Sequence, residues 1–290
     1  MIRTSLIVAL LLAALPVQHA AAQTYKFKKV SYDKKNYTSL HDINAGGTVA
    51  GGYFANGATV RNCFLLKGKT KTTLSDPDAS FGTECWGINT GGDVVGDYLD
   101  ASSNYHGYIY TGGSFTTIDP PASVYTVIYG INDSKTVIGY YLDKSGVSHG
   151  FTYNGTKYKV INIKGGTTTE GFGINASGQY TVSTVLSDGL EHSYVFTGKK
   201  SMELVFPNIA QVAAHHINTA GQVCATVIDA SSNYSGGVYD PVKKAYYVLT
   251  YPKAALTVMD GINDSETLVG RYSVTTSSES FGYIATGKLP

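Results

Sequence analysis

The residues best suited to chemistry are two histidines and one aspartate that take the same place in a repeated motif. The dipeptide Ile-Asn recurs along the chain, and the residue two positions before its Ile is His41, His215 and Asp260 in three copies. The other copies carry aromatic residues there. Two imidazoles and a carboxylate can bind zinc or transfer protons. They can equally replace aromatic packing by hydrogen-bonded polar groups, which is the simpler interpretation. Whether a metal binds stays open.

Other candidate groups also follow the repeat. An Asp precedes a His by a few residues in three copies: Asp100 and His106, Asp143 and His149, and Asp188 and His192. Because an active site normally occurs once, we interpret these pairs as groups that build loops. Glu84 and Glu170 share one repeat position and could flank a sugar as a carboxylate pair. Nucleophile-elbow, zinc-protease and phosphate-loop motifs are absent from the sequence.

The spacing of the repeat predicts the elements that position these groups. The Ile-Asn pairs begin at residues 43, 88, 131, 174, 217 and 262, so the period is 43 to 45 residues. Short runs rich in Val, Ile, Tyr, Phe and Thr lie between Gly-, Asn- and Asp-containing turns, as in antiparallel strands. In the third copy we expect strands over 126–131, 136–142, 150–153 and 158–163. A constant period of this length predicts an all-β, six-bladed β-propeller with four antiparallel strands per blade.

The two ends of the chain predict how the ring closes. Residues 25–30 resemble the outer strand of a blade, since Phe27 precedes Ile43 by 16 residues, as Phe115 precedes Ile131. The last copy ends at Pro290, where its own outer strand should begin. We therefore expect one domain over residues 23–290, in which the N-terminal strand completes the last blade and covers its open edge.

The Asn of the motif and the three cysteines have structural interpretations. The Asn opens the turn between the first two strands, where its side chain can bind backbone amides and a nearby Gly can adopt positive φ. Cys224 falls in an apolar repeat position and is expected to be buried. A disulfide between Cys63 and Cys85 would join neighbouring blades, but count alone does not decide it.

Residues 1–22 have the pattern of a signal peptide. Arg3 precedes a short apolar run, and Ala20, Ala21 and Ala22 offer a cleavage site. The chain has 22 basic and 21 acidic residues, so removing Arg3 leaves 21 of each. A neutral chain without a basic cluster offers little to nucleic acid or to a membrane. We expect a secreted or periplasmic monomer without a cofactor and without membrane insertion after signal cleavage.

The amino-acid sequence of the repeat also resembles that of a known family. Gly87-Ile88-Asn89 with His106-Gly107-Tyr108, and Gly130-Ile131-Asn132 with His149-Gly150-Phe151, are similar to the HAF repeats of bacterial extracellular proteins. The resemblance covers about residues 25–290 and is weaker in the first, fourth, fifth and sixth copies. It implies an extracytoplasmic protein and no particular activity.

These observations favour a binding protein over an enzyme. We predict a secreted, non-enzymatic propeller that binds a glycan or another surface component, including a surface protein, through exposed loops. Tyr37 and Tyr125 lie near those loops and suit stacking against a sugar, beside His41, His215 and Asp260. The alternatives are a periplasmic glycoside hydrolase or lyase that uses central carboxylates and histidines, and a structural surface module without a small ligand.

Overall fold

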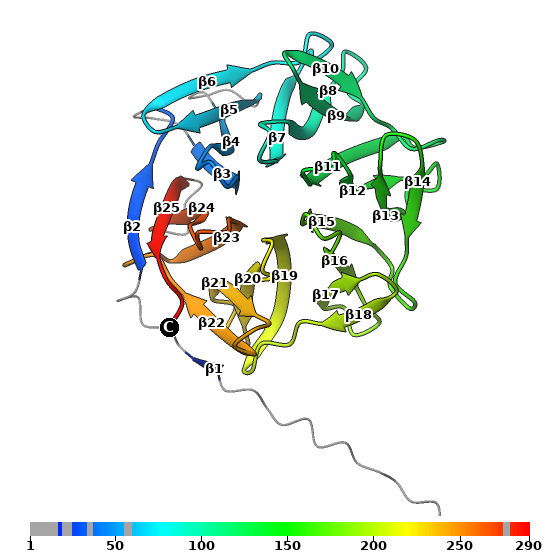
Figure 1. Ribbon diagram of the computed structural model, residues 1–290. Coiled ribbons are helices and arrows are strands. Elements are labelled where there is room, and N and C mark those ends of the chain that lie inside the picture. The colour runs from blue at the N-terminus through cyan, green and yellow to red at the C-terminus, as the bar shows by residue number, and fades with distance from the viewer. Residues whose placement is uncertain (1–16, 19–24, 34–36, 55–59, 275–278) are drawn as a thin grey trace, which may run out of the picture.

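The computed structural model describes residues 17–18, 25–33, 37–54, 60–274 and 279–290, and every regular element in this part of the chain is a β-strand. Successive strands pair antiparallel in groups of four, and the groups are arranged radially about a common axis (Figure 1). We call each group a blade. The prediction of an all-β chain built from four-stranded antiparallel sheets is confirmed.

The strands of the blades follow the chain in order. Blade 1 contains β3 (Tyr37–Ile43), β4 (Val49–Phe54), β5 (Arg61–Lys67) and β6 (Thr70–Leu74). Blade 2 contains β7 (Gly82–Ile88), β8 (Val94–Leu99), β9 (Tyr105–Thr111) and β10 (Ser114–Thr117). Blade 3 contains β11 (Tyr125–Ile131), β12 (Val137–Leu142), β13 (Ser148–Tyr153) and β14 (Tyr158–Ile161). Blade 4 contains β15 (Glu170–Ile174), β16 (Tyr180–Val185), β17 (Glu191–Thr197) and β18 (Lys200–Glu203). Blade 5 contains β19 (Ile209–Ile217), β20 (Val223–Asp229), β21 (Tyr234–Asp240) and β22 (Ala245–Leu249). Blade 6 contains β23 (Leu256–Ile262), β24 (Leu268–Ser273) and β25 (Phe281–Gly287).

The fourth strand of blade 6 comes from the other end of the chain. β2 (Tyr25–Val30) pairs antiparallel with β25, from Tyr25 opposite Gly287 to Val30 opposite Gly282. Figure 1 shows β2 in blue beside the red β25. Tyr25 and Val30 are both buried, so this strand contributes to the core as well as to the sheet. The predicted signal segment lies outside the described residues except for β1 (Val17–Gln18), which pairs parallel with β22.

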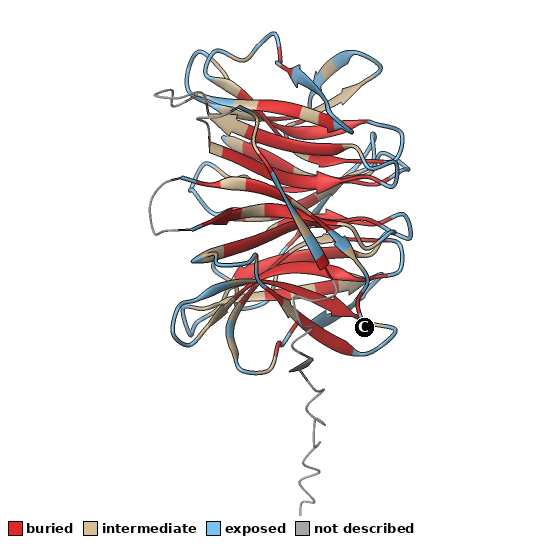
Figure 2. Ribbon diagram, turned by 90° about the vertical axis from the view of Figure 1, so that its left-hand side faces the viewer, coloured by how far each residue is buried: buried red, intermediate tan, exposed pale blue. Residues whose placement is uncertain are grey.

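Neighbouring blades are also linked by short parallel contacts. Arg61 of β5 pairs with Gly82 of β7, and Tyr234 of β21 pairs with Leu256 of β23, so these sheets continue from one blade into the next. The core lies between the blades. Figure 2 shows buried residues along the strands and exposed residues in the loops at both ends. Gly107 illustrates the packing, because a Cβ there would lie 2.8 Å from a side-chain carbon of Ile128 in the next blade.

The Asn of each Ile-Asn pair does more than open a turn. Each side-chain oxygen accepts the backbone N–H four residues on, as Asn132 Oδ1 does from Thr136 at 3.0 Å. Each Nδ2 donates to the carbonyl of the equivalent Asn in the next blade. These bonds run from Asn44 to Asn89, Asn132, Asn175, Asn218 and Asn263, at 2.9 to 3.2 Å, and Asn263 donates to Asn44 at 3.2 Å. The turn interpretation is confirmed, and the side chains also tie each blade to the next.

The first strand of each blade lies nearest the axis, and we call these strands the innermost strands (Figure 1). They approach one another closely near this ring of Asn. A Cβ at Gly130 would lie 2.4 Å from the carbonyl oxygen of Phe172, and one at Gly173 would lie 2.7 Å from that of His215. At Gly130 and Gly173 the backbone of the next blade therefore leaves no room for a side chain. The same position holds Asp42 in blade 1 and His216 in blade 5.

The innermost strands are not regular at the position two before the Ile. The pairing of each of these strands with the second strand of its blade shifts there, between Ile128 and Gly130 in blade 3 and between Cys85 and Gly87 in blade 2. Such a β-bulge inserts one residue and breaks the two-residue alternation of side chains. Counting alternate residues from the Ile therefore does not fix the face of this position.

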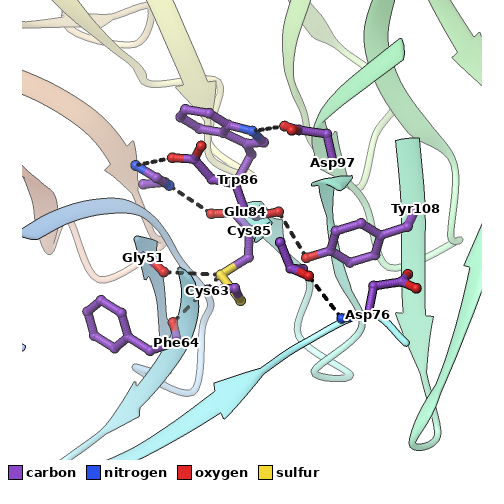
Figure 3. The surroundings of a disulfide bond; sticks show 11 residues. Gly51, Cys63, Phe64, Asp76, Glu84, Cys85, Trp86, Asp97 and Tyr108 are labelled. Carbon is purple, nitrogen blue, oxygen red and sulfur yellow. Dashed lines mark hydrogen bonds and ion pairs between the residues drawn. A yellow bond between two sulfur atoms is a disulfide. The ribbon is translucent and has the colours of Figure 1, made fainter. Parts of the chain in front are cut away.

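The disulfide left open by the sequence is present. Cys63 in β5 and Cys85 in β7 are bonded, with their Cα atoms 5.2 Å apart (Figure 3). The bond joins blades 1 and 2. Cys224 is free and buried, as predicted.

Candidate functional site

Six side chains, one from each innermost strand, occupy the bulge position and follow one another around the axis. His41 stacks on Trp86 with ring centroids 4.2 Å apart, and Trp86 meets Tyr129 edge-on at 5.1 Å. Tyr129 stacks on Phe172 at 4.8 Å, and Phe172 meets His215 at 5.6 Å. His215 Nε2 lies 3.8 Å from an oxygen of Asp260. The aromatic and the polar residues thus belong to one layer.

The three polar members of this layer mainly contact the neighbouring strands. His41 Nδ1 lies 2.7 Å from the carbonyl oxygen of Cys85, and His215 Nε2 lies 3.2 Å from the hydroxyl of Thr226. Burial lowers the pKa of His41 to about 4 and that of His215 to about 3, so both rings are neutral at pH 7. Burial raises the pKa of Asp260, and Arg271, whose guanidinium lies 3.4 Å away, opposes that rise.

This arrangement matches the packing interpretation in its contacts. Each imidazole bonds a backbone carbonyl or a Thr hydroxyl, as expected for polar groups that replace aromatic packing. Within the described residues, no three His, Cys, Asp or Glu side chains are placed to hold a metal ion.

A second group of charged side chains lies between blades 1 and 2. Glu84 of β7 and Asp97 of β8 are directly opposite one another in the sheet, and both are buried. Arg61 of β5 pairs with Glu84. Trp86 Nε1 donates to Asp97 at 2.6 Å (Figure 3). Burial, and then the charge of Glu84, raises the pKa of Asp97 to about 8. Asp97 is therefore protonated at pH 7. Burial also raises the pKa of Glu84, and the charge of Arg61 and its hydrogen bond oppose that rise.

These groups border a small hollow. It has a volume of about 70 Å³ and is lined by Arg61, Phe81, Gly82, Glu84, Asp97, Leu99 and Tyr105. Glu84 is a candidate from its repeat position, whereas Arg61 and Asp97 were not predicted. No signal in the repeat identifies them, since their importance comes from the strand pairing that sets them beside Glu84.

The predicted pair of Glu84 and Glu170 is not brought to one hollow. Glu170 of β15 lies in blade 4, where it lines a hollow of about 260 Å³ with Glu191, Ser183 and Thr184. Burial, and then the charge of Glu191, raises the pKa of Glu170 to about 7. Glu84 therefore has Asp97 as its neighbouring carboxyl group, and Glu170 has Glu191.

An opening lined by aromatic residues lies between blades 2 and 3. A hollow of about 260 Å³ is lined by Asn104, Tyr105, His106, Asp119, Ser123, Val124 and Tyr125. The rings of Tyr105 and Tyr125 lie 4.6 Å apart and are both partly exposed. Val124 is 50% exposed beside them. Tyr125, a predicted site residue, therefore lies in a hollow that combines aromatic and polar groups.

The polar side of this hollow is built by one of the Asp–His loops. His106 Nδ1 lies 2.7 Å from Asp119, and its Nε2 lies 3.3 Å from Asp100. These two carboxylates outweigh partial burial and raise the pKa of His106. The equivalent His149 and His192 contact Asp143 and Asp188. The prediction that these pairs brace their loops is confirmed, and in blade 2 the brace also lines a hollow.

Tyr37, the remaining predicted site residue, lies in blade 1. It is partly exposed and meets Phe54 edge-on at 5.3 Å. It belongs neither to the hollow of Tyr125 nor to that of Glu84. The five predicted ligand-binding residues are therefore divided among the bulge layer, blade 1 and the gap between blades 2 and 3.

A polar opening lies at the end of the axis that the ring of Asn occupies. It has a volume of about 80 Å³ and is lined by the Asn ring together with Asp42 and His216. His216 Nδ1 lies 3.3 Å from Asp42 Oδ1, so these two residues pair across the intervening blade 6. Asp42 Oδ2 also accepts the backbone N–H of Ile88 at 2.9 Å. The pair therefore has a structural role at this end of the axis.

Comparison with known proteins supports the fold. The chain is similar to the SapL1 lectin in complex with alpha methyl fucoside, with 9% identity over 88% of this chain and 97% of the lectin, and a TM-score of 0.56. It is similar to the β-propeller domain of the Trilobed protease from Pyrococcus furiosus, with 11% identity over 87% and 94% of the two chains, and a TM-score of 0.52. The fold is a β-propeller.

A third similar structure is the sialidase of Trypanosoma rangeli, with 9% identity, a TM-score of 0.56, and coverage of 89% of this chain but 59% of the sialidase. At such identities the likeness of this propeller to all three proteins shows the fold alone. No protein-family model and no curated protein sequence matches the chain. In the described residues, no helix is long and apolar enough to cross a membrane.

Proposed function

We propose that this protein is a secreted or periplasmic six-bladed β-propeller, closed by β2, that binds a glycan without cleaving it. The binding site is the hollow between blades 2 and 3. The observation that carries this proposal is the pair of partly exposed rings, Tyr105 and Tyr125, set beside His106 and Asp119 in one opening.

The chemistry of this hollow suits a sugar. The apolar faces of Tyr105 and Tyr125 can pack against the C–H groups of a pyranose ring. His106 and Asp119 can exchange hydrogen bonds with sugar hydroxyls. Few convergent polar groups within an apolar wall are the usual composition of a small-molecule site. The bound alpha methyl fucoside of the SapL1 lectin makes that compound a suitable first probe.

Export and the HAF-repeat resemblance are parts of the same proposal. Residues 1–22 have the pattern of a signal peptide, and the repeat resembles that of extracellular proteins. Mass spectrometry of protein recovered from the periplasm or medium would give its first residue. A chain that keeps residues 1–22 and stays in the cytoplasm would contradict this part.

The experiment for the site is a glycan array followed by calorimetric titration. We expect Tyr125→Ala to weaken binding at least about tenfold, the loss expected when one stacking ring is removed. Tyr153→Ala is the matched control, because Tyr153 stacks on Tyr158 at 4.2 Å in blade 3 without lining this hollow. No bound glycan, or equal loss in both variants, would overturn the proposal.

A glycoside hydrolase is the second candidate. The specific observation in its favour is the opposed pair of Glu84 and Asp97, in which Glu84 pairs with Arg61 and Asp97 is protonated at pH 7. Such a pair can supply a base and an acid to a glycosidic bond. Product analysis of the glycans that bind separates the two functions: intact glycan supports binding alone, and released sugar supports the enzyme.

A further inference from the structure

The hollow proposed to bind a glycan, between blades 2 and 3, shares one lining side chain with a second hollow. Tyr105 lines both the hollow between blades 2 and 3 and the hollow between blades 1 and 2. The first contains Tyr125 and His106, and the second contains Arg61, Glu84 and Asp97. A ligand bound against Tyr105 on one side can therefore extend to charged groups on the other.

We propose that the ligand is a neutral oligosaccharide of at least two units, with one unit against Tyr125 and the next in the hollow of Arg61, Glu84 and Asp97. The inference rests on the proposed glycan-binding function and adds a second subsite to it. The second hollow is small, so it receives the edge of a sugar ring with its hydroxyls, and the body of that unit lies against Tyr105.

The second hollow is built to exchange hydrogen bonds with hydroxyls. Arg61 is about half exposed, with a side-chain exposure of 52%, and it can donate to a ligand while it holds Glu84. Glu84 and Asp97 are buried, yet both line the opening. Phe81, which is 48% exposed, supplies an apolar wall. Polar groups at the base and apolar groups at the wall match the two kinds of surface that a sugar presents.

These polar groups are held in place before any ligand arrives. Trp86 Nε1 fixes the carboxyl group of Asp97, and the hydroxyl of Tyr108 donates to the backbone carbonyl of Glu84 at 3.0 Å. The disulfide of Cys85, the residue after Glu84, anchors the same strand to blade 1. A preorganised site loses less conformational entropy on binding.

The charge of the hollow selects a neutral ligand. Arg61 and Glu84 neutralise one another, and Asp97 is uncharged at pH 7 because burial and the charge of Glu84 raise its pKa to about 8. The sum is therefore zero. A charged sugar would compete for Arg61 or Glu84 and leave the other member of this ion pair without its partner.

The test compares single sugars with disaccharides. Methyl glycosides of fucose, galactose, glucose, mannose and N-acetylglucosamine are titrated calorimetrically, each against neutral disaccharides that contain the same unit. We expect the disaccharide of the recognised sugar to bind at least about tenfold more tightly, because hydrogen bonds to charged groups are among the stronger ones. Binding of the methyl glycoside with no gain for any disaccharide would overturn the second subsite and leave the first intact. Absence of binding to every sugar would overturn both.

Variants then assign the gain to the second hollow. Arg61→Ala should remove the gain and leave binding of the methyl glycoside unchanged. Lys135→Ala is the matched control, since the Lys135 side chain is 54% exposed and pairs with the buried Asp93 at 3.2 Å outside both hollows. A gain that survives Arg61→Ala, or is lost equally in Lys135→Ala, would contradict the proposal.

Asp97→Asn tests the role of the second hollow without removing Arg61. In the wild type the gain should decline above about pH 8, because Asp97 then ionises beside Glu84 and gives the hollow a negative charge. Asn stays neutral and can still accept from Trp86, so this variant should keep the gain at pH 9. Identical pH profiles in the two proteins would overturn the assignment of the charge.

Discussion

Replacing one Asn of the ring by Asp tests whether the bonds between blades stabilise the protein. Asn132 is buried, its Nδ2 donates to the carbonyl of Asn175 at 3.2 Å, and its Oδ1 accepts backbone N–H groups from Ser134 at 3.1 Å and Thr136 at 3.0 Å. Asn132→Asp retains the acceptor and its two local bonds. It removes only the donor and places a carboxylate oxygen against the carbonyl of Asn175.

The expected cost follows from these contacts. Loss of the hydrogen bond costs about 1 kcal/mol, and a buried charge held against a carbonyl oxygen adds a further 1–3 kcal/mol. The free energy of unfolding should fall by about 2–4 kcal/mol at pH 7. At about 2 °C per kcal/mol for a domain of this size, the melting temperature should fall by about 4–8 °C.

The dependence on pH gives the result a sign. Burial should raise the pKa of the introduced carboxyl group in the folded state, so the cost is present at neutral pH. It should shrink as the pH falls through that pKa, because the protonated group can again donate to Asn175. Differential scanning calorimetry at pH 7 and pH 4.5 would measure both effects.

Asn154→Asp is the control for the local bonds. Asn154 is exposed, and its Oδ1 also accepts two backbone N–H groups, from Thr156 at 3.1 Å and Lys157 at 2.9 Å. Its free energy of unfolding should change by less than about 0.5 kcal/mol. Equal effects of the two substitutions would refute the reasoning, since the bond between blades would then contribute nothing measurable.

Three further predictions concern closure, the disulfide and pH. Deleting residues 23–32 should lower the melting temperature strongly and promote association, because β25 loses its partner and exposes an edge; calorimetry and light scattering would show this, and an unchanged monomer would argue against closure by β2. The double variant Cys63→Ala/Cys85→Ala should lose about 3 kcal/mol of stability, since the bond spans 22 residues and restricts the unfolded chain; an unchanged midpoint in urea would contradict this. The contribution of Asp97 to stability should fall as the pH rises from about 4 to 8, because folded Asp97 holds a proton that the unfolded chain releases, while the buried neutral His41 and His215 act in the opposite direction; urea titrations should therefore show a stability difference between wild type and Asp97→Asn that changes over this range, and a constant difference would contradict the raised pKa.

The regular part of this protein follows from its sequence. The Ile-Asn period gives the order and length of the strands, and the position of Phe27 relative to Ile43 indicates that the first strand belongs to the last blade. The strand pattern depends on local preferences that each copy of the repeat contains. The placement of the first strand follows from comparing its position with that of the same strand in another copy. The Asp–His pairs are similarly local, because His106 contacts Asp100 only six residues away.

The bulge and the disulfide needed the tertiary structure. A bulge depends on how two strands pair, so counting alternate residues from Ile131 does not fix the face of Tyr129. The bond between Cys63 and Cys85 depends on a 5.2 Å separation of Cα atoms across two blades, which the number of cysteines does not fix.

The site was decided in the same way. Glu84 and Glu170 share a repeat position, but that equivalence puts them in different blades, and the strand opposite Glu84 supplies Asp97 as its actual partner. Tyr125 lies beside Tyr105 only because blade 3 packs against blade 2. A repeat specifies what each blade contains, whereas a binding site between blades depends on side chains that meet only after the blades pack.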